Sequence, residues 1–403
     1  MASHPRDVTP EDLEKPKPIY AVWEVTLKCD QACRHCGSRA GRARVDELDT
    51  AEAIDLGRQL AELGCREITL IGGELYLRKD AAELVRGLSE MGLYVSALTG
   101  GRAVRPELLS DLVESGLKAL SVSIDGLEEV HERLRRVPGG WQKALGVLDA
   151  AREVGLPVGA NTQINRLNKD QLPELATILQ DHGVVGWQVQ LTMPMGRAAD
   201  LPDLILQPWE ILDLLEVLAE IQWAAITRAA RDDTPTFNVC GADDIGYYGP
   251  YETVLRSHPS SQPSWWIGCH GGLRGIGIEA DGTIKPCLSQ PTDSYAVGSI
   301  RERPLAELWA EARQRAIGVG RTVEELWGFC RTCEYAATCL AGCPSTTHST
   351  VGRWGNNPFC WHRAKELRRQ GLRERLVHAE EPPGGGFDHG RFEIVQEPWP
   401  DAE

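Results

Sequence analysis

The sequence predicts an α/β protein: a partial (β/α)6 TIM-like barrel followed by a small cysteine-rich domain. Three observations support this prediction. Short apolar runs alternate with segments of helical spacing over roughly the first 190 residues. Glycines or polar residues follow several of these runs. The cysteines fall mainly into two groups, one near residue 30 and one after residue 268.

Six apolar runs are typical of β-strands, at residues 21–27, 67–71, 94–98, 119–124, 157–162 and 186–191. Apolar residues at helical spacing predict intervening helices over 50–63, 81–91, 106–114, 141–154 and 171–181. Strands joined by helices of this length pair in parallel through right-handed crossovers. The alternation therefore favours an open six-stranded barrel, although periodicity alone also fits a doubly wound sheet.

A chain of 403 residues suits about two domains. The expected divisions are an N-terminal tail over 1–17, a core over 18–230, a connector over 231–264 and a cysteine-rich domain over 265–365. The core ends in a long amphipathic helix, predicted over 209–228. A basic helix is predicted over 362–376, so residues 366–403 comprise its end and a flexible acidic tail.

Composition excludes several classes of protein. Hydrophobic residues make up 42% and charged residues 25%, as in ordinary globular proteins. Neither a membrane-length apolar run nor the apolar segment of a signal peptide is present. We therefore expect no membrane association and a cytoplasmic location, where twelve cysteines suit metal binding better than disulfides. A net charge of −15 without a basic stripe disfavours nucleic-acid binding.

Three cysteines follow the first predicted strand with the spacing C-x3-C-x2-C: Cys29, Cys33 and Cys36. A [4Fe–4S] cluster takes up to four thiolates, so three from one loop leave one iron open. Zinc is the alternative and needs a fourth ligand, for which His35 lies inside the loop. The spacing and position resemble those of the radical SAM superfamily, whose open iron chelates the amino and carboxylate groups of S-adenosylmethionine (SAM).

Further residues of this resemblance follow the later strands, where parallel sheets bind ligands. Gly72-Gly73-Glu74 resembles the family's GGE motif, which contacts the SAM amino group, although Leu75 replaces the usual proline. Taken alone, Gly72-Gly73-Glu74 and the Ser123-Ile124-Asp125-Gly126 segment are more often ordinary turns, and Asn161 alone carries almost no weight. By resemblance, their joint placement implies a SAM site made by His35, Gly72, Gly73, Glu74, Ser123, Asp125 and Asn161. No catalytic acid or base is predicted.

The second cysteine group has the arrangement C-x12-G-x4-C, a gap, C-x2-C-x5-C-x3-C, a gap and a last cysteine. A zinc ribbon separates its cysteine pairs by about 15–20 residues, whereas five residues separate Cys333 from Cys339. The arrangement resembles the SPASM domain, which holds two auxiliary [4Fe–4S] clusters. That resemblance implies an outer cluster on Cys330, Cys333, Cys339 and Cys360, and an inner cluster on Cys269, Cys287 and Cys343.

The sequence does not decide the fourth ligand of the inner cluster: one iron has no protein ligand, or Cys240 or His270 binds it. The remaining cysteine, Cys65, is expected to be a buried apolar residue.

Together the resemblances imply a radical SAM/SPASM oxidoreductase that uses a 5′-deoxyadenosyl radical to modify an unactivated C–H bond. The favoured substrate is a ribosomally made peptide, modified by a crosslink, thioether, epimerisation or conversion to a cofactor precursor. A small molecule or tetrapyrrole is the alternative, as is a non-enzymatic iron–sulfur electron-transfer protein that would not need Glu74. Sulfatase maturation is disfavoured, because those enzymes have an acidic residue where this chain has Leu288.

Two partners are expected. Only about 20 residues precede the first strand, so binding of a peptide leader is expected to need a separate protein. Reduction of the clusters is expected to need a carrier such as flavodoxin or ferredoxin.

Overall fold

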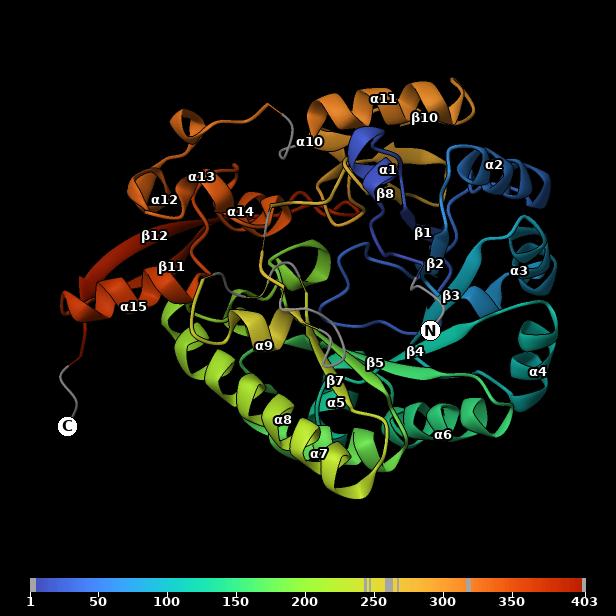
Figure 1. The fold of residues 1–403 in the computed structure, drawn as a ribbon, viewed down its shortest axis with the longest axis horizontal. Helices are drawn as coiled ribbons and strands as arrows, with labels where there is room; N and C mark the ends of the chain where they lie inside the picture. The colour runs from blue at the N-terminus through green and yellow to red at the C-terminus, as the bar shows by residue number, and fades with distance from the viewer. Residues whose placement is uncertain are drawn as a thin grey trace.

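The computed structural model describes residues 5–242, 245, 248–257, 264–266, 268–316 and 320–400. Within them, one sheet has the strand order β10-β9-β8-β1-β2-β3-β4-β5-β6-β7 (Figure 1). Every neighbouring pair from β1 to β6 is parallel, which confirms the predicted six-stranded core. These strands are β1 (Tyr20–Thr26), β2 (Glu67–Gly72), β3 (Tyr94–Thr99), β4 (Ala119–Ser123), β5 (Val158–Ile164) and β6 (Gly186–Leu191).

Helices cover the outer face of this curved sheet (Figure 1). The connecting helices are α2 (Thr50–Glu62), α3 (Ala81–Glu90), α4 (Pro106–Glu114), α5 (Glu128–Arg135), α6 (Gly140–Glu153), α7 (Leu172–Asp181) and α8 (Ile211–Asp232). Their boundaries follow local chemistry. Asp49 caps α2 through a capping box with Glu52, and Pro106 occupies the first turn of α4. The apolar stripes of these helices form one continuous core with the strands.

The predicted connector is partly structured. It contains β7 (Asn238–Gly241), which pairs in parallel with β6, and α9 (Glu252–Arg256). A strand of four residues is too short to stand out as a periodic pattern. Residues 243–244, 246–247 and 258–263 of this segment lie outside the described part of the chain.

The cysteine-rich region continues the same sheet on its other edge. Its strands are β8 (Gly275–Ile278), β9 (Thr283–Lys285) and β10 (Gly298–Ser299), and β8 pairs directly with β1 in parallel. Its helices are α10 (Thr292–Tyr295), α11 (Leu305–Arg315), α12 (Gly328–Thr332), α13 (Ala336–Cys339) and α14 (Pro344–Val351). β1 has β2 of the barrel on one side and β8 of the cysteine-rich region on the other. The first cysteine loop follows β1 directly, so it begins where the two regions meet.

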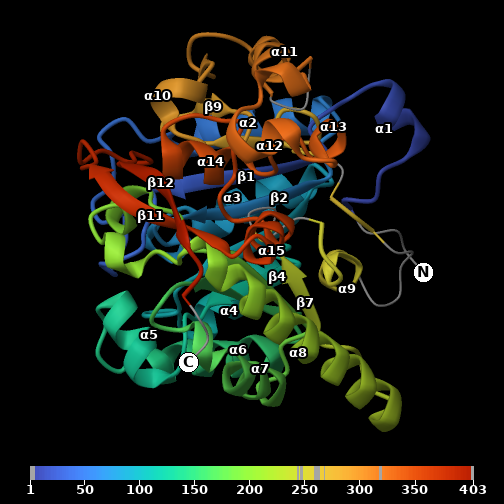
Figure 2. The same ribbon diagram turned by 90° about the vertical axis from the view of Figure 1, so that its left-hand side faces the viewer.

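The C-terminal segment differs from the predicted helix and flexible tail. Helix α15 spans only Trp361–Arg369, and an antiparallel hairpin of β11 (Leu372–Glu380) and β12 (Arg391–Pro398) follows. Figure 2 shows the hairpin beside α14 and α15. Gly371, with φ of +71°, follows the end of the helix, while Leu376 and Phe392 become buried. The Pro-Gly-rich stretch read as a flexible tail is the hairpin loop.

The predicted N-terminal tail also contains regular structure. It contains α1 (Pro10–Glu14), and Arg6 forms a bidentate ion pair with Glu67 of β2. Short 3-10 turns occur at η1 (Leu75–Leu77), η2 (Lys169–Gln171), η3 (Gly196–Ala198), η4 (Pro202–Leu204), η5 (Pro208–Glu210) and η6 (Val323–Glu325). Among the described helices, none combines the length and apolar character that crossing a membrane requires.

Candidate active site

A cavity of about 250 Å³ lies at the carboxyl ends of the barrel strands. The cavity is lined by the first cysteine loop, by β1 and the ends of β2 to β6, by Arg135 of α5, by residues 193–197 after β6, by the segment after β9 and by the C-terminal hairpin loop. Eight residues predicted from the sequence meet here: Cys29, Cys33, His35, Cys36, Gly72, Gly73, Glu74 and Ser123. Asp125 and Asn161 are not among the lining residues.

The first cysteine loop is fixed by backbone contacts at both ends. Cys29 N donates to Gly41 O at 3.0 Å, and Gly41 N donates to Leu27 O at 2.8 Å. Burial raises the pKa of Cys29 to about 12 and also raises that of Cys33. A thiol with a raised pKa becomes a thiolate only beside positive charge, and bound iron supplies such charge. The three cysteines therefore suit a metal cluster.

Two arginines that the sequence analysis missed hold this loop. Arg197 donates to Cys33 O at 2.7 Å and to Ala40 O at 3.0 Å. Arg39 forms a bidentate pair with Asp200 and also contacts Asp388 of the hairpin loop. Both arginines join segments distant in sequence, so no local pattern marks them.

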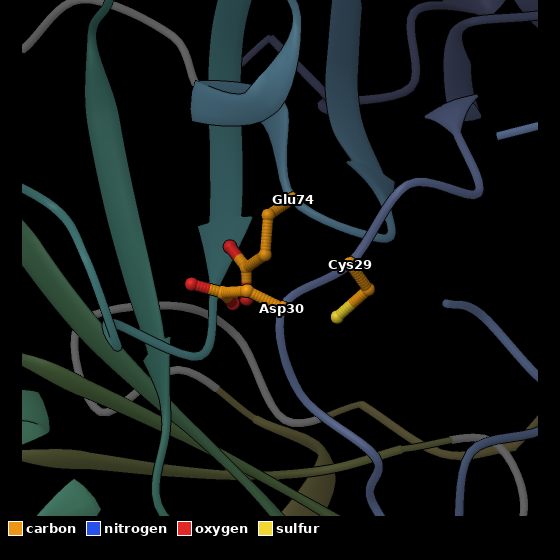
Figure 3. Close-up of side chains that lie close together, drawn as sticks. All are labelled: Cys29, Asp30 and Glu74. Carbon is orange, nitrogen blue, oxygen red and sulfur yellow. The ribbon is translucent and has the colours of Figure 1, made fainter. Parts of the chain in front are cut away.

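Glu74 lies beside Cys29 at the end of β2, with Asp30 close to both (Figure 3). Ligand atoms of these three residues lie within 4.8 Å of one another. The Glu74 carboxylate accepts hydrogen bonds from Thr99 Oγ1 at 2.6 Å and Gly100 N at 2.7 Å. Burial nevertheless raises the pKa of Glu74 to about 7. Two carboxylates beside a cluster cysteine are chemically suited to an ammonium group.

Gly72 and Gly73 line the cavity and also pack closely against the neighbouring backbone. A Cβ on Gly73 would lie 2.1 Å from Lys28 O, and one on Gly72 would lie 2.4 Å from Thr26 O. Gly72 also has φ of +126°, which favours glycine. The two glycines let β2 approach the backbone just before the first cysteine, which sets the position of the loop.

Asp125 is fully buried behind the cavity wall rather than facing it. Its Oδ2 lies 3.0 Å from His35 Nε2 and 2.6 Å from Arg135 Nη2. Although burial acts in the opposite direction, Arg135 and His35 hold the pKa of Asp125 well below its usual range. Asp125 therefore contacts two cavity-lining side chains, His35 and Arg135, without lining the cavity itself.

Asn161 also differs from its prediction, because β5 continues to Ile164 and Asn161 lies inside the strand. Gln163, two residues further along the same face, lines the cavity instead. Two further lining residues, Thr99 and Gly100, were not predicted; they lie at the end of β3 as Gly72 and Gly73 lie at the end of β2. Their position directly after the strand predicted over 94–98 was the sequence signal that could have identified them.

The cavity also has an apolar wall. Met195, Leu288 and Phe387 are buried against one another, joined by the partly buried Val22, Ile71 and Met193. Phe387 comes from the hairpin loop, and its N–H donates to Gly37 O at 2.9 Å. The C-terminal hairpin thereby becomes part of the active-site wall, which excludes water from that side.

Four cysteines of the second group converge on a separate apolar cavity. Cys330, Cys333, Cys339 and Cys360 line it together with Tyr248 and Tyr335, which stack at 4.5 Å. Burial and the neighbouring thiols raise the pKa of Cys360 to about 12. These four side chains could hold one cluster, as the resemblance implied.

The other three cysteines lie nearer the sheet. Cys269 and Cys343 both act electrostatically on Tyr295, whose pKa burial raises to about 12. Cys287 lies two residues after the end of β9, next to Leu288 and Ser289, which line the first cavity. Cys240 is on β7, where Asn238 contacts its thiol and Arg6 is its charged neighbour.

Comparison with protein families matches residues 23–179 to the radical SAM superfamily and residues 269–334 to the SPASM iron–sulfur cluster-binding domain. The chain is 28% identical over 349 residues to an AdoMet-dependent heme synthase of Methanosarcina barkeri, covering 86% of this chain and 97% of the relative. It is 25% identical over 368 residues to a PqqA peptide cyclase of Rhizobium meliloti, covering 89% of each chain.

Among solved structures, SuiB of Streptococcus suis bound to its precursor peptide SuiA has the same fold. The TM-score is 0.62 at 16% identity, over 87% of this chain and 77% of that chain. The two family matches imply SAM and [4Fe–4S] clusters as cofactors, and the cysteine-lined cavities fit such clusters. The chain is therefore an enzyme with a radical SAM domain over residues 23–179 and a SPASM domain over residues 269–334.

Proposed function

We propose that this enzyme modifies an unactivated C–H bond in a ribosomally made peptide. The observation that carries the proposal is the apolar wall of the active-site cavity. Met195, Leu288 and Phe387 form this wall, which suits an amino-acid side chain. The similarity to the PqqA peptide cyclase supports the same substrate class.

Within this proposal, Cys29, Cys33 and Cys36 hold the cluster that binds SAM, and Glu74 binds the SAM ammonium group. The chemistry these groups supply when bound is hydrogen-atom abstraction by a 5′-deoxyadenosyl radical. Ser123 and Gln163 hydrogen-bond the remaining polar groups of SAM, while His35 bounds the site beside them. Asp125 keeps His35 and Arg135 in place, and the wall around Phe387 excludes water from the reacting side.

The auxiliary cysteines divide as the resemblance implied. Cys330, Cys333, Cys339 and Cys360 hold the outer cluster, which their shared cavity supports. Cys269, Cys287 and Cys343 hold the inner cluster. In this proposal Cys240 is not a ligand, which is supported by the contact of its thiol with Asn238 and by Arg6 as a charged neighbour.

The test is anaerobic incubation with SAM, a reductant and the short peptides encoded beside the gene. We expect 5′-deoxyadenosine together with a change in the mass of one peptide. The matched control replaces Cys29, Cys33 and Cys36 with alanine, which should remove about 4 of about 12 irons and abolish both products. Deoxyadenosine formation by that triple variant would contradict the cluster assignment.

A tetrapyrrole substrate is the second candidate, favoured by the similarity to the AdoMet-dependent heme synthase over 97% of that relative. The same assay with an iron porphyrin separates the two. Stimulation of deoxyadenosine formation by the porphyrin and by no peptide would replace the proposed substrate while leaving the radical chemistry intact.

We also propose that the enzyme acts in the cytoplasm, with a flavodoxin or ferredoxin as reductant and a separate protein that binds the peptide leader. The abundance of cysteines at metal-binding spacing supports a reducing compartment. Co-purification of the enzyme with a small leader-binding protein encoded nearby would test the last point.

A further inference from the structure

A buried carboxyl group on β1 faces the cavity apart from the Glu74 site. Glu24 lines the cavity and is only 1% exposed. Its Oε1 has no hydrogen-bond partner among the residues that the structure describes. Since β1 adjoins β8 on one side and β2 on the other, Glu24 lies toward the cysteine-rich region, whereas Glu74 lies toward β3.

The two cations near Glu24 are already paired with other carboxylates. Lys285 Nζ lies 2.9 Å from Glu279 Oε1, and its other donors reach Gln290 O and Thr292 Oγ1. Arg44 pairs with Glu279 at 2.8 Å and with Asp281 at 2.7 Å. Two cations thus match two carboxylates, and Glu24 is a third carboxyl group with no cation of its own.

This surplus of carboxyl groups favours the neutral form of Glu24. Burial raises the pKa of Glu24 to about 8, and the Glu279 carboxylate adds to this shift against the opposing effects of Arg44, Lys285 and the Ser38 hydroxyl. A buried carboxyl group in this state exchanges its proton for a cation when one enters, because the ion pair then replaces the missing counter-charge.

We infer that Glu24 is a substrate-binding residue that takes an ammonium or guanidinium group of the substrate and releases its own proton to solvent as that cation binds. The inference rests on the proposed peptide function, since lysine, arginine and the peptide N-terminus carry such groups. The neighbouring wall of Val22, Ile71 and Phe387 suits the aliphatic stem of such a side chain. No electron moves in this step.

The experiment uses infrared difference spectra of the anaerobic holoenzyme with oxidised clusters and SAM bound, so that Glu74 is occupied. Subtraction of the Glu24→Gln variant isolates the Glu24 carboxyl band. At pH 7 we expect a protonated-carboxyl band that disappears with n-butylammonium or n-butylguanidinium and persists with n-butanol. Absence of the band, or a band that neither cation changes, would overturn the inference.

Glu24→Asp provides a second variant if the glutamine variant does not fold. It keeps a titratable carboxyl group, so the band should shift and should still respond to the two cations. Failure of the inference differs from failure of the proposed function. Peptide turnover with a cation-insensitive Glu24 band refutes the inference alone, whereas a cation-sensitive band with turnover of only a porphyrin refutes the peptide function alone.

Discussion

Replacing Glu74 with glutamine removes the negative charge of the proposed ammonium site while preserving its shape. The Glu74 Oε1 accepts hydrogen bonds from Gly100 N and Gln31 Nε2, and a glutamine carbonyl oxygen can accept both. The glutamine amide then faces Thr99, whose hydroxyl can turn to accept instead of donate. The variant should therefore fold normally and retain its clusters.

The size of the effect follows from the interaction that is lost. A hydrogen bond between charged groups contributes about 1.5–3 kcal/mol. At about 1.4 kcal/mol per tenfold change, the Kd for SAM should rise by about 10- to 150-fold. Asp30 lies within the same group of ligand atoms and keeps one carboxylate in the site, so binding should weaken rather than vanish.

The assay is anaerobic equilibrium binding of SAM to reconstituted protein with matched iron content. Glu83→Gln on the exposed face of α3 is the control, because it removes the same charge away from the cavity. An unchanged Kd in Glu74→Gln with full iron content would show that Glu74 only shapes the turn after β2.

Three further outcomes are expected. Burial lowers the folded-state pKa of both His131 and His348 to about 4, so the unfolded chain binds protons in this range that the folded chain does not. Each histidine should lower the unfolding free energy by about 2 kcal/mol from pH 7.5 to 5, and His131→Asn should remove about half of the combined fall, measured by denaturant unfolding. Glu374→Ala leaves Arg363 buried without its bidentate partner and should cost about 3–5 kcal/mol of unfolding free energy, whereas an unchanged midpoint would contradict the importance of the pair. Cys240→Ala should leave iron content and the auxiliary EPR signals unchanged; a lost signal would make Cys240 a ligand.

The barrel strands and the cysteine groups were predictable because each is a local pattern. Alternating apolar periodicity marked β1 to β6, and fixed spacing brought Cys330, Cys333 and Cys339 to one cavity. Glu74 was predictable for the same reason, since it follows a strand directly. The strands, the cysteine spacing and the position of Glu74 all depend on residues that are close together in the sequence.

Other features depend on contacts between distant segments. The position of Asp125 behind the wall is set by Arg135 on α5 and His35 in the cysteine loop, which no spacing encodes. The C-terminal hairpin resembled a disordered tail in composition, yet Phe387 is buried against Met195 and Leu288. Composition describes how much apolar surface a segment has, whereas burial depends on what the rest of the chain presents to it.

The pairing of β8 with β1 has a consequence for how the chain is made. Tyr20 lies opposite Gly275, so the first strand gains its second neighbour only after about two thirds of the protein has left the ribosome. Until then β1 is an open sheet edge, which can pair with another chain. A fragment that stops at the end of the barrel would keep that edge permanently, so the SAM-binding half should not be expected to remain monomeric when it is produced alone.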